Sequence, residues 1–137
     1  MLKSISDIIC DGDYMWIMSE ELPCLFRYNN VTHEMVLKAI FPDEAHAMSA
    51  FSRMIKLGSE IYFIPWIVKE IYYYNIAKDE FHKLDLTFKD FSSDNNRQTE
   101  VVAEGVNLYC IDRIPDAVIE INSVTKEVKV FQADMQL

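Results

Sequence analysis

The chain has little of what most catalytic and cofactor-binding motifs need. Of its 137 residues only three are glycine, three are cysteine and three are histidine. A loop that cradles nucleotide phosphates needs several closely spaced glycines, and the sequence has no such cluster. It also has no Gly-x-Ser-x-Gly motif and no Cys-His nucleophile arrangement. We therefore predict no catalytic residues and no cofactor.

The cysteines and histidines are scattered rather than patterned. They are Cys10, Cys24, Cys110, His33, His46 and His82. No Cys-x-x-Cys pair and no i, i+4 histidine pair occurs, so we predict no metal site. An odd number of unpatterned cysteines suits reduced thiols in the cytosol. Cys10 and Cys110 lie in apolar runs, and we expect both to pack in the core.

Basic residues and long apolar runs are also scarce. The formal net charge is −9, from 13 basic and 22 acidic residues. Phosphate binding needs a basic stripe, so we expect neither nucleic acid nor an anionic membrane as partner. No apolar run approaches the roughly 20 residues of a membrane-spanning helix, and the first residues lack the apolar core of a secretory signal. We expect a soluble, cytoplasmic protein.

An internal repeat organises the chain. Gly12, Gly58 and Gly105 are 46 and 47 residues apart, and other residues recur at fixed distances from them. The recurring residues are an aromatic four residues later (Trp16, Tyr62, Tyr109), an asparagine after seventeen (Asn29, Asn75, Asn122) and a glutamate after twenty-two (Glu34, Glu80, Glu127). No gap is needed between glycine and glutamate in any copy. We predict that the glycines supply turns with positive φ and that the asparagines hydrogen-bond their own backbone.

Each copy divides into four short extended segments joined by turns. In the middle copy these are 51–57, 61–64, 70–74 and 80–86, rich in β-branched and aromatic residues. Four such strands with short connections form one antiparallel sheet. We therefore predict an all-β chain of three four-stranded sheets, over 4–41, 51–86 and 100–131. A short helical turn is expected within 42–50, and 88–98 is a polar connecting loop.

A repeat of about 40 to 50 residues with four strands per unit is typical of a β-propeller blade. Through its glycine, the following aromatic and the Tyr-Asn step before the last strand, the chain resembles the kelch-like and WD-like propeller repeat families. It lacks the Gly-Gly doublet of kelch repeats and the Gly-His and Trp-Asp pairs of WD repeats. The resemblance therefore implies the blade architecture and no family binding residues.

Three blades do not close a propeller ring, which usually holds four to eight. A homodimer with six blades in one ring is the simplest solution, and a blade flank left uncovered would otherwise expose apolar sheet surface. A fragment of a longer propeller is a second solution, and an open array completed by a different partner is a third. The sequence leaves all three open.

Candidate binding residues come from the loops between second and third strands, each of which contains a proline: Pro23, Pro65 and Pro115. In a propeller these loops lie near the mouth of the central channel. The residues predicted there are Glu20, Glu21, Trp66, Lys69, Asp112, Arg113 and Asp116. Trp66 is the strongest candidate, because an exposed tryptophan stacks on sugars or anchors peptides, although packing between blades is its commoner role. Arg53, in an innermost strand, either faces the channel or forms a salt bridge across it.

These observations favour a non-enzymatic binding or interaction module that forms a homodimer and uses the loops around Trp66 and Arg113. The alternative is a lectin-like glycan binder, or part of a propeller enzyme acting on glycans. A glycan site would need exposed aromatics beside paired carboxylates, whose separation in space the sequence does not give.

Overall fold

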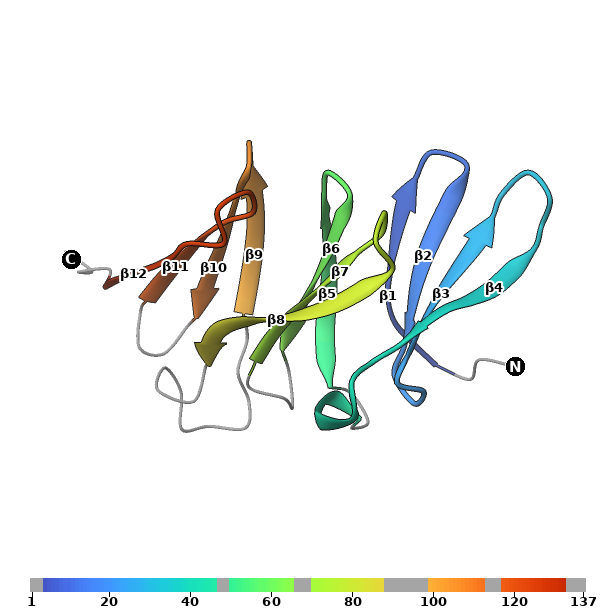
Figure 1. Cartoon of the computed structure of the whole chain (residues 1–137), viewed down its shortest axis with the longest axis horizontal. Helices are drawn as coiled ribbons and strands as arrows, with labels where there is room; N and C mark the ends of the chain where they lie inside the picture. The colour runs from blue at the N-terminus through green and yellow to red at the C-terminus, as the bar shows by residue number, and fades with distance from the viewer. Residues whose placement is uncertain (1–3, 47–49, 66–69, 88–98, 113–116, 133–137) are drawn as a thin grey trace. The chain divides into compact units, whose positions relative to one another are not determined.

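A computed structural model describes residues 4–46, 50–65, 70–87, 99–112 and 117–132. Within them the chain forms three four-stranded antiparallel sheets, each built from consecutive strands (Figure 1). We call the sheets blade 1, blade 2 and blade 3. This confirms the all-β class and the four strands expected in each repeat. A 3-10 turn at Asp43–Ala45 (η1) confirms the short helical segment expected between the first two copies.

Strand bounds follow the repeat closely. Blade 1 contains β1 (Ile5–Asp11), β2 (Tyr14–Ser19), β3 (Cys24–Asn29) and β4 (Met35–Ile40). Blade 2 contains β5 (Phe51–Leu57), β6 (Glu60–Pro65), β7 (Glu70–Asn75) and β8 (Glu80–Thr87). Blade 3 contains β9 (Thr99–Glu104), β10 (Asn107–Asp112), β11 (Ala117–Asn122) and β12 (Val128–Gln132). Within the described residues no helix is long and apolar enough to cross a membrane.

The repeated turn residues have the predicted conformations. Gly12, Gly58 and Gly105 all have φ between 58° and 60°. A second left-handed position follows twenty-one residues after each glycine, at His33, Asp79 and Lys126, with φ of 63°, 56° and 62°. This position was not predicted from the sequence, because three unlike residues occupy it. Asn29 Oδ1 accepts hydrogen bonds from the N–H groups of Val31 and Thr32 at 2.8 and 3.1 Å, and Asn75 and Asn122 also bond the backbone of their own turns.

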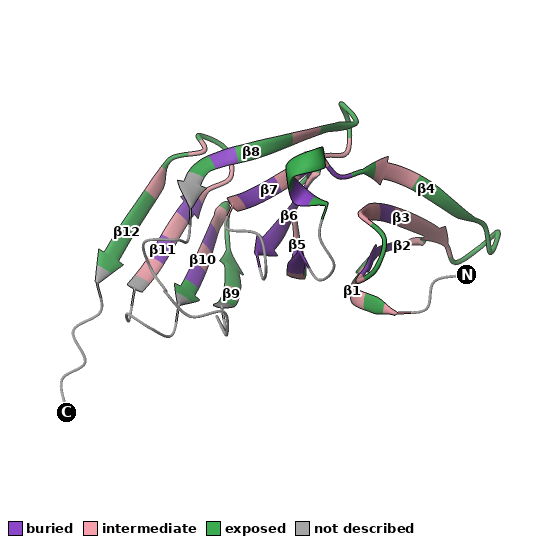
Figure 2. Ribbon diagram, turned by 90° about the horizontal axis from the view of Figure 1, so that it is seen from below, coloured by how far each residue is buried: buried purple, intermediate pink, exposed green. Residues whose placement is uncertain are grey.

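The chain divides into two compact units, Met1–Lys83 and Leu84–Leu137. In the first unit the buried aromatic core lies between blade 1 and blade 2. Its members include Trp16, Met18, Leu25, Phe41, Phe51, Met54, Ile61, Phe63, Tyr72 and Tyr74. Figure 2 shows this burial as purple along β5, β6 and β7, whereas β4 is largely exposed. In the second unit Leu108, Cys110, Ile119 and Ile121 are fully buried on one face of blade 3.

Register pairs show which residues share a face of blade 1, because directly opposed residues of an antiparallel pair point to the same side. Trp16 pairs with Arg27, and Met18 with Leu25, on the side that packs against blade 2. The other side is formed by the remaining cross-strand sets. These are Ile8–Ile17–Phe26–Leu37 and Cys10–Met15–Tyr28–Met35. We call this second side the open face of blade 1.

The two cysteines expected in the core differ. Cys110 is fully buried in β10, as predicted. The prediction for Cys10 was wrong, because Cys10 is exposed on the open face. Its apolar neighbours in the sequence suggested a core position. They line a sheet face that no other layer covers among the described residues of the first unit, so apolar neighbours along the strand did not bring burial.

Candidate interaction surface

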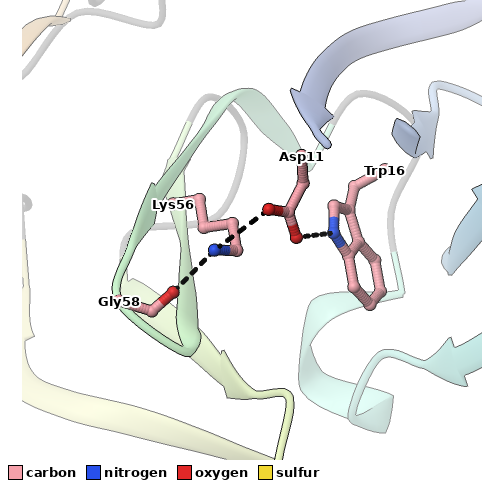
Figure 3. A network of polar contacts seen from close by, with 4 residues as sticks. All are labelled: Asp11, Trp16, Lys56 and Gly58. Carbon is pink, nitrogen blue, oxygen red and sulfur yellow. Dashed lines mark hydrogen bonds and ion pairs between the residues drawn. The ribbon is translucent and has the colours of Figure 1, made fainter. Parts of the chain in front are cut away.

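The interface between blades 1 and 2 is joined by polar contacts at the inner strands. Asp7 Oδ2 accepts a hydrogen bond from the Met54 backbone N–H at 2.8 Å. Nearer the turns, Asp11 lies between two partners, accepting from the Trp16 indole N–H at 3.3 Å and pairing with Lys56 Nζ at 3.4 Å (Figure 3). Lys56 Nζ also donates to the Gly58 carbonyl at 2.7 Å. Asp11 thus links its own blade to the first turn of the next.

Aromatic rings fill the rest of this interface. Phe41, after β4, makes edge contacts with Phe51, Phe63 and Phe81, with ring centroids 5.2, 4.9 and 5.2 Å away. Edge-to-face pairs of this kind add about 0.5–1.5 kcal/mol each beyond simple burial. The segment leaving blade 1 therefore anchors itself in the core of blade 2, which fixes how these two blades pack.

A cation lies at the outer part of the same interface. The guanidinium of Arg27 is 4.3 Å from the ring centroid of Tyr14 and 5.7 Å from that of Trp16, distances at which cation–π attraction operates. Trp16 in turn meets Tyr74 of blade 2 edge-on at 6.3 Å. The Tyr74 hydroxyl donates a hydrogen bond to Asp79 Oδ1. Burial, this bond and the Asp79 charge raise the pKa of Tyr74, and the nearby positive charge of Arg27 opposes them.

Tyr72 places a hydroxyl group in this interface that is buried without a hydrogen-bond partner among the described residues. Its side chain is only 1% exposed. Burial, with the negative charges of Glu44 and Glu70, raises the pKa of Tyr72 to about 12. The ring is thus retained for packing rather than for its hydroxyl.

The open face of blade 1 is the repeat equivalent of the covered face of blade 2. Counting from each glycine, Ile8 corresponds to Met54, and Phe26 to Tyr72. Met54 and Tyr72 are 3% and 1% exposed, whereas Ile8 is 44% exposed. Met35, also on the open face, is 49% exposed. The same positions that form a core in blade 2 therefore form an uncharged surface in blade 1 that is accessible at Ile8, Cys10, Met35 and Leu37, partly accessible at Met15, Phe26 and Tyr28, and buried at Ile17.

Blade 3 has an accessible face of its own. Its register places Val102, Tyr109 and Glu120 on one side of the sheet, away from the buried Leu108 and Cys110. Val102 is 58% exposed, and the same side includes Ile111 and Phe131, which are 48% and 50% exposed. By repeat position this side corresponds to the side of blade 1 that packs on blade 2.

Most of the predicted loop site lies outside the described residues. This applies to Trp66, Lys69, Arg113 and Asp116, and to the side chain of Asp112 at the end of β10. Glu20 is partly exposed and its backbone N–H donates to the Ser4 carbonyl at 3.3 Å, while the Glu21 N–H donates to Ser19 Oγ at 3.2 Å. Arg53 is exposed in β5. The channel-mouth site therefore stays a prediction.

Clefts and groups of metal-binding side chains are the other places among the described residues where a site could form. A cleft on blade 1 is lined by Tyr14, Arg27, Asn29, Glu34 and Val36. No group of three His, Cys, Asp or Glu side chains able to hold a metal ion occurs in the described ranges. The sequence predicted that an uncovered blade flank would expose apolar surface, but it did not identify which side of which blade, because strand alternation alone does not say which apolar sides have a covering layer.

Comparisons with known proteins agree with the fold. No family model matches the sequence. A curated relative, septin-8-B from Xenopus laevis, is 32% identical over 127 residues, which cover 89% of this chain and 26% of the septin. The chain thus spans about a quarter of that relative's length.

Among solved structures, the extracellular domain of a hybrid two-component system from B. thetaiotaomicron matches with a TM-score of 0.68 at 15% identity, over 96% of this chain and 16% of that one. A second structure of an extracellular domain from that organism, from a one-component system, gives 0.66 at 13%, over 94% and 18%. A chain in the S. cerevisiae complex of Dbp5, Nup159 and Gle1 gives 0.61 at 8%, over 93% and 29%. At these identities the likeness shows the fold alone. The chain is an all-β protein built of propeller-like blades.

Proposed function

We propose that this chain is a non-enzymatic interaction module, a half-propeller that completes a six-bladed ring with a second copy. The observation that carries the proposal is the open face of blade 1. Its positions are those that blade 2 buries against its neighbour, yet in blade 1 only Ile17 of this set is buried, while Ile8, Leu37 and Met35 are 44–53% exposed, and the set has no charged side chain. Covering them removes apolar surface from water, at about 25 cal/mol per Å².

A second copy suits the open face because the chain already contains a blade of the same repeat that covers the equivalent face of blade 2. Blade 1 covers blade 2 with Trp16, Met18 and Leu25. Blade 3 offers the repeat equivalents of these three residues, Tyr109, Ile111 and Val118, on its accessible side. Two such contacts, one at each end, would make a closed ring of six blades. The two solutions the sequence also allowed, a missing part of a longer chain and a different partner, are outcomes of the test.

Sedimentation of a charged variant tests this function. Ile8→Glu places a carboxylate where the equivalent Met54 is 3% exposed, and burying an unpaired charge costs about 3 kcal/mol or more. We expect the dimer dissociation constant to rise at least about 100-fold. Val36→Glu is the matched control, because Val36 is 42% exposed and pairs with Arg27 on the other side of blade 1 from the open face. Equal self-association of both variants and the parent would overturn the proposal.

The second candidate is a glycan-binding protein, or part of a propeller enzyme acting on glycans. Its basis is Trp66 beside Pro65 in a loop predicted at the channel mouth, with Glu20, Asp112, Arg113 and Lys69 as the polar groups. Titration with a panel of oligosaccharides, followed by tryptophan fluorescence, tests it. Trp66→Ala should abolish a response seen in the parent, since Trp16 is only 1% exposed. Unchanged binding would remove Trp66 from the site.

Where the chain works remains a proposal. Its cysteines favour the cytoplasm, and no disulfide joins the three, which are all free. Two of the structural relatives are extracellular domains, but likeness of fold does not carry location. Labelling of Cys10 in the Ile8→Glu variant in intact cells by a membrane-impermeant maleimide would separate the two, because this variant leaves the open face uncovered and only an extracellular thiol would react.

A further inference from the structure

The packing of blade 1 on blade 2 provides a template for the interface that would close the ring. Every contact in it has a repeat position, so the residues that would meet at the closing interface follow by counting from the glycines. The covering side is then blade 3 of one copy, and the covered side is the open face of blade 1 of the other. This inference rests on the proposed function and specifies its geometry.

The turn between the third and fourth strands of each blade, which we call the outer turn, is the most informative place to compare repeat equivalents. Between blades 1 and 2, the cation Arg27 lies near Tyr74, whose hydroxyl donates to the carboxylate of Asp79. The equivalent of Arg27 on blade 3 is an acid, Glu120. The equivalent of Asp79 on blade 1 is a base, His33.

His33 matches Asp79 in conformation as well as in repeat position. The φ angles are 63° and 56°, and the Tyr28 hydroxyl lies 2.8 Å from His33 Nδ1 as the Tyr74 hydroxyl bonds Asp79. The tyrosine is therefore common to both turns, while its partner changes from a carboxylate to an imidazole, whose ring N–H can donate a hydrogen bond. Because the carboxylate of Glu120 stands where Arg27 does on the opposite side, acceptor and donor exchange sides and the pair remains complementary.

At the turn between the first and second strands, which we call the inner turn, the closing interface would have weaker polar contacts than the internal interface. Asp11 pairs with Lys56 there, and their equivalents are Glu104 and Cys10, which make no ion pair. The Asp11 side chain is still 36% exposed in the internal interface, so Glu104 at the same position stays in contact with water rather than being buried unpaired. The closing interface would then be mainly apolar, with its charge complementarity at the outer turn.

We infer that blade 3 of a second copy docks on the open face of blade 1 in the register of the internal interface, with Glu120 beside the Tyr28–His33 pair. The alternative is a dimer in which two open faces meet each other. In that arrangement His33 of each copy would lie against the open face of the other copy, and the cross-strand sets of that face contain no carboxylate. The carboxylate of Glu120 opposite the imidazole of His33 therefore favours contact with blade 3.

A charge exchange tests the register. His33→Asp recreates the residue of blade 2 at an identical turn position, so its fold should be preserved, but it would set two acids against each other. We expect dimer dissociation to increase about fivefold, the effect of an exposed pair. Adding Glu120→Arg rebuilds the Arg27–Asp79 arrangement and should return the dissociation constant to within about twofold of the parent. Thermal melting of each variant at dilute concentration checks folding.

Thiol cross-linking separates the two dimer geometries. Glu104→Cys should join to native Cys10 of another copy through a short bismaleimide, shown by peptide masses in a mixture of nitrogen-14 and nitrogen-15 chains. A linked pair of Cys10 residues, or a double variant as weak as His33→Asp alone, would overturn the register while leaving a dimer. A parent chain that stays monomeric at every concentration would instead overturn the proposed function.

Discussion

The covered face of blade 2 and the open face of blade 1 use the same repeat positions in two different environments. In blade 2 these positions hold Phe63, Tyr72 and Tyr74, which are at most 1% exposed. In blade 1 the corresponding residues are Ile17, which is 4% exposed, and Phe26 and Tyr28, which are partly exposed, while Ile8 and Met35 beside them are 44–49% exposed. The difference comes from the neighbouring layer: blade 1 covers blade 2, and no other layer among the described residues of the first unit covers the open face of blade 1.

The residues on the two faces reflect this difference in covering only in part. Blade 2 has the larger aromatic rings where it packs, and its equivalent of Cys10 is Lys56, which reaches Asp11 of the covering blade. Blade 1 has smaller and more flexible apolar groups and no charge on that face. A surface of this kind suits an interface that forms after each chain has folded.

The largest effect should come from removing a ring of the covered face. Phe63→Ala leaves a cavity among Phe41, Phe51 and Phe81, and we expect a loss of about 3–5 kcal/mol in the free energy of unfolding. The control is Met35→Ala on the open face, which should cost under about 1 kcal/mol in the monomer. Urea unfolding at dilute concentration measures both. Equal losses would mean that the two faces are not in different environments.

A turn substitution should affect both blades equally. Gly58 has φ of 58°, and nothing lies within 4 Å of an added Cβ, so Gly58→Ala costs only the strain of a left-handed alanine, about 1–2 kcal/mol. Gly12→Ala, at φ of 59°, should cost the same, because turn strain does not depend on a covering layer. Thermal unfolding of the two variants gives the comparison. A difference above about 1 kcal/mol would show that one glycine has a further role.

The ion pair between the blades should contribute less. Asp11→Asn removes the charge opposite Lys56 but keeps an acceptor for the Trp16 indole. With side chains 27% and 36% exposed, the pair should be worth about 0.2–1 kcal/mol and weaken with salt. A double-mutant cycle with Lys56→Met isolates it. Absence of coupling at low salt would mean that Asp11 acts only through Trp16.

The smallest effect, and the only gain, should come from Tyr72→Phe. Removing a buried hydroxyl without a partner should leave stability unchanged or raise it by up to about 1 kcal/mol. Because the folded pKa, about 12, exceeds the ordinary value near 10, stability is fully present below pH 10 and is lost as pH rises through 12. The variant should lose stability less steeply over that range in pH-dependent unfolding. A steeper loss, or clear destabilisation, would show that the hydroxyl is bonded.

The repeat made most of the fold predictable. Local rules sufficed for the turns, since Gly12 needs positive φ and Asn29 bonds its own turn wherever the sheet lies. They did not suffice for Cys10 or for the open face, because burial there depends on which layer packs on the sheet. The left-handed conformation of His33 and the cation–π contact of Arg27 were also missed: one position tolerates His, Asp and Lys alike, and the other depends on packing across strands. The loop site around Trp66 stays a prediction.

Self-association of the unmodified chain tests the central claim most directly. Light scattering on a sizing column, over a wide range of concentrations, gives the solution mass of a chain of 16.0 kDa. A stable species of twice that mass, lost in Ile8→Glu and retained in Val36→Glu, is the predicted result. A single species at the mass of one chain throughout would contradict it.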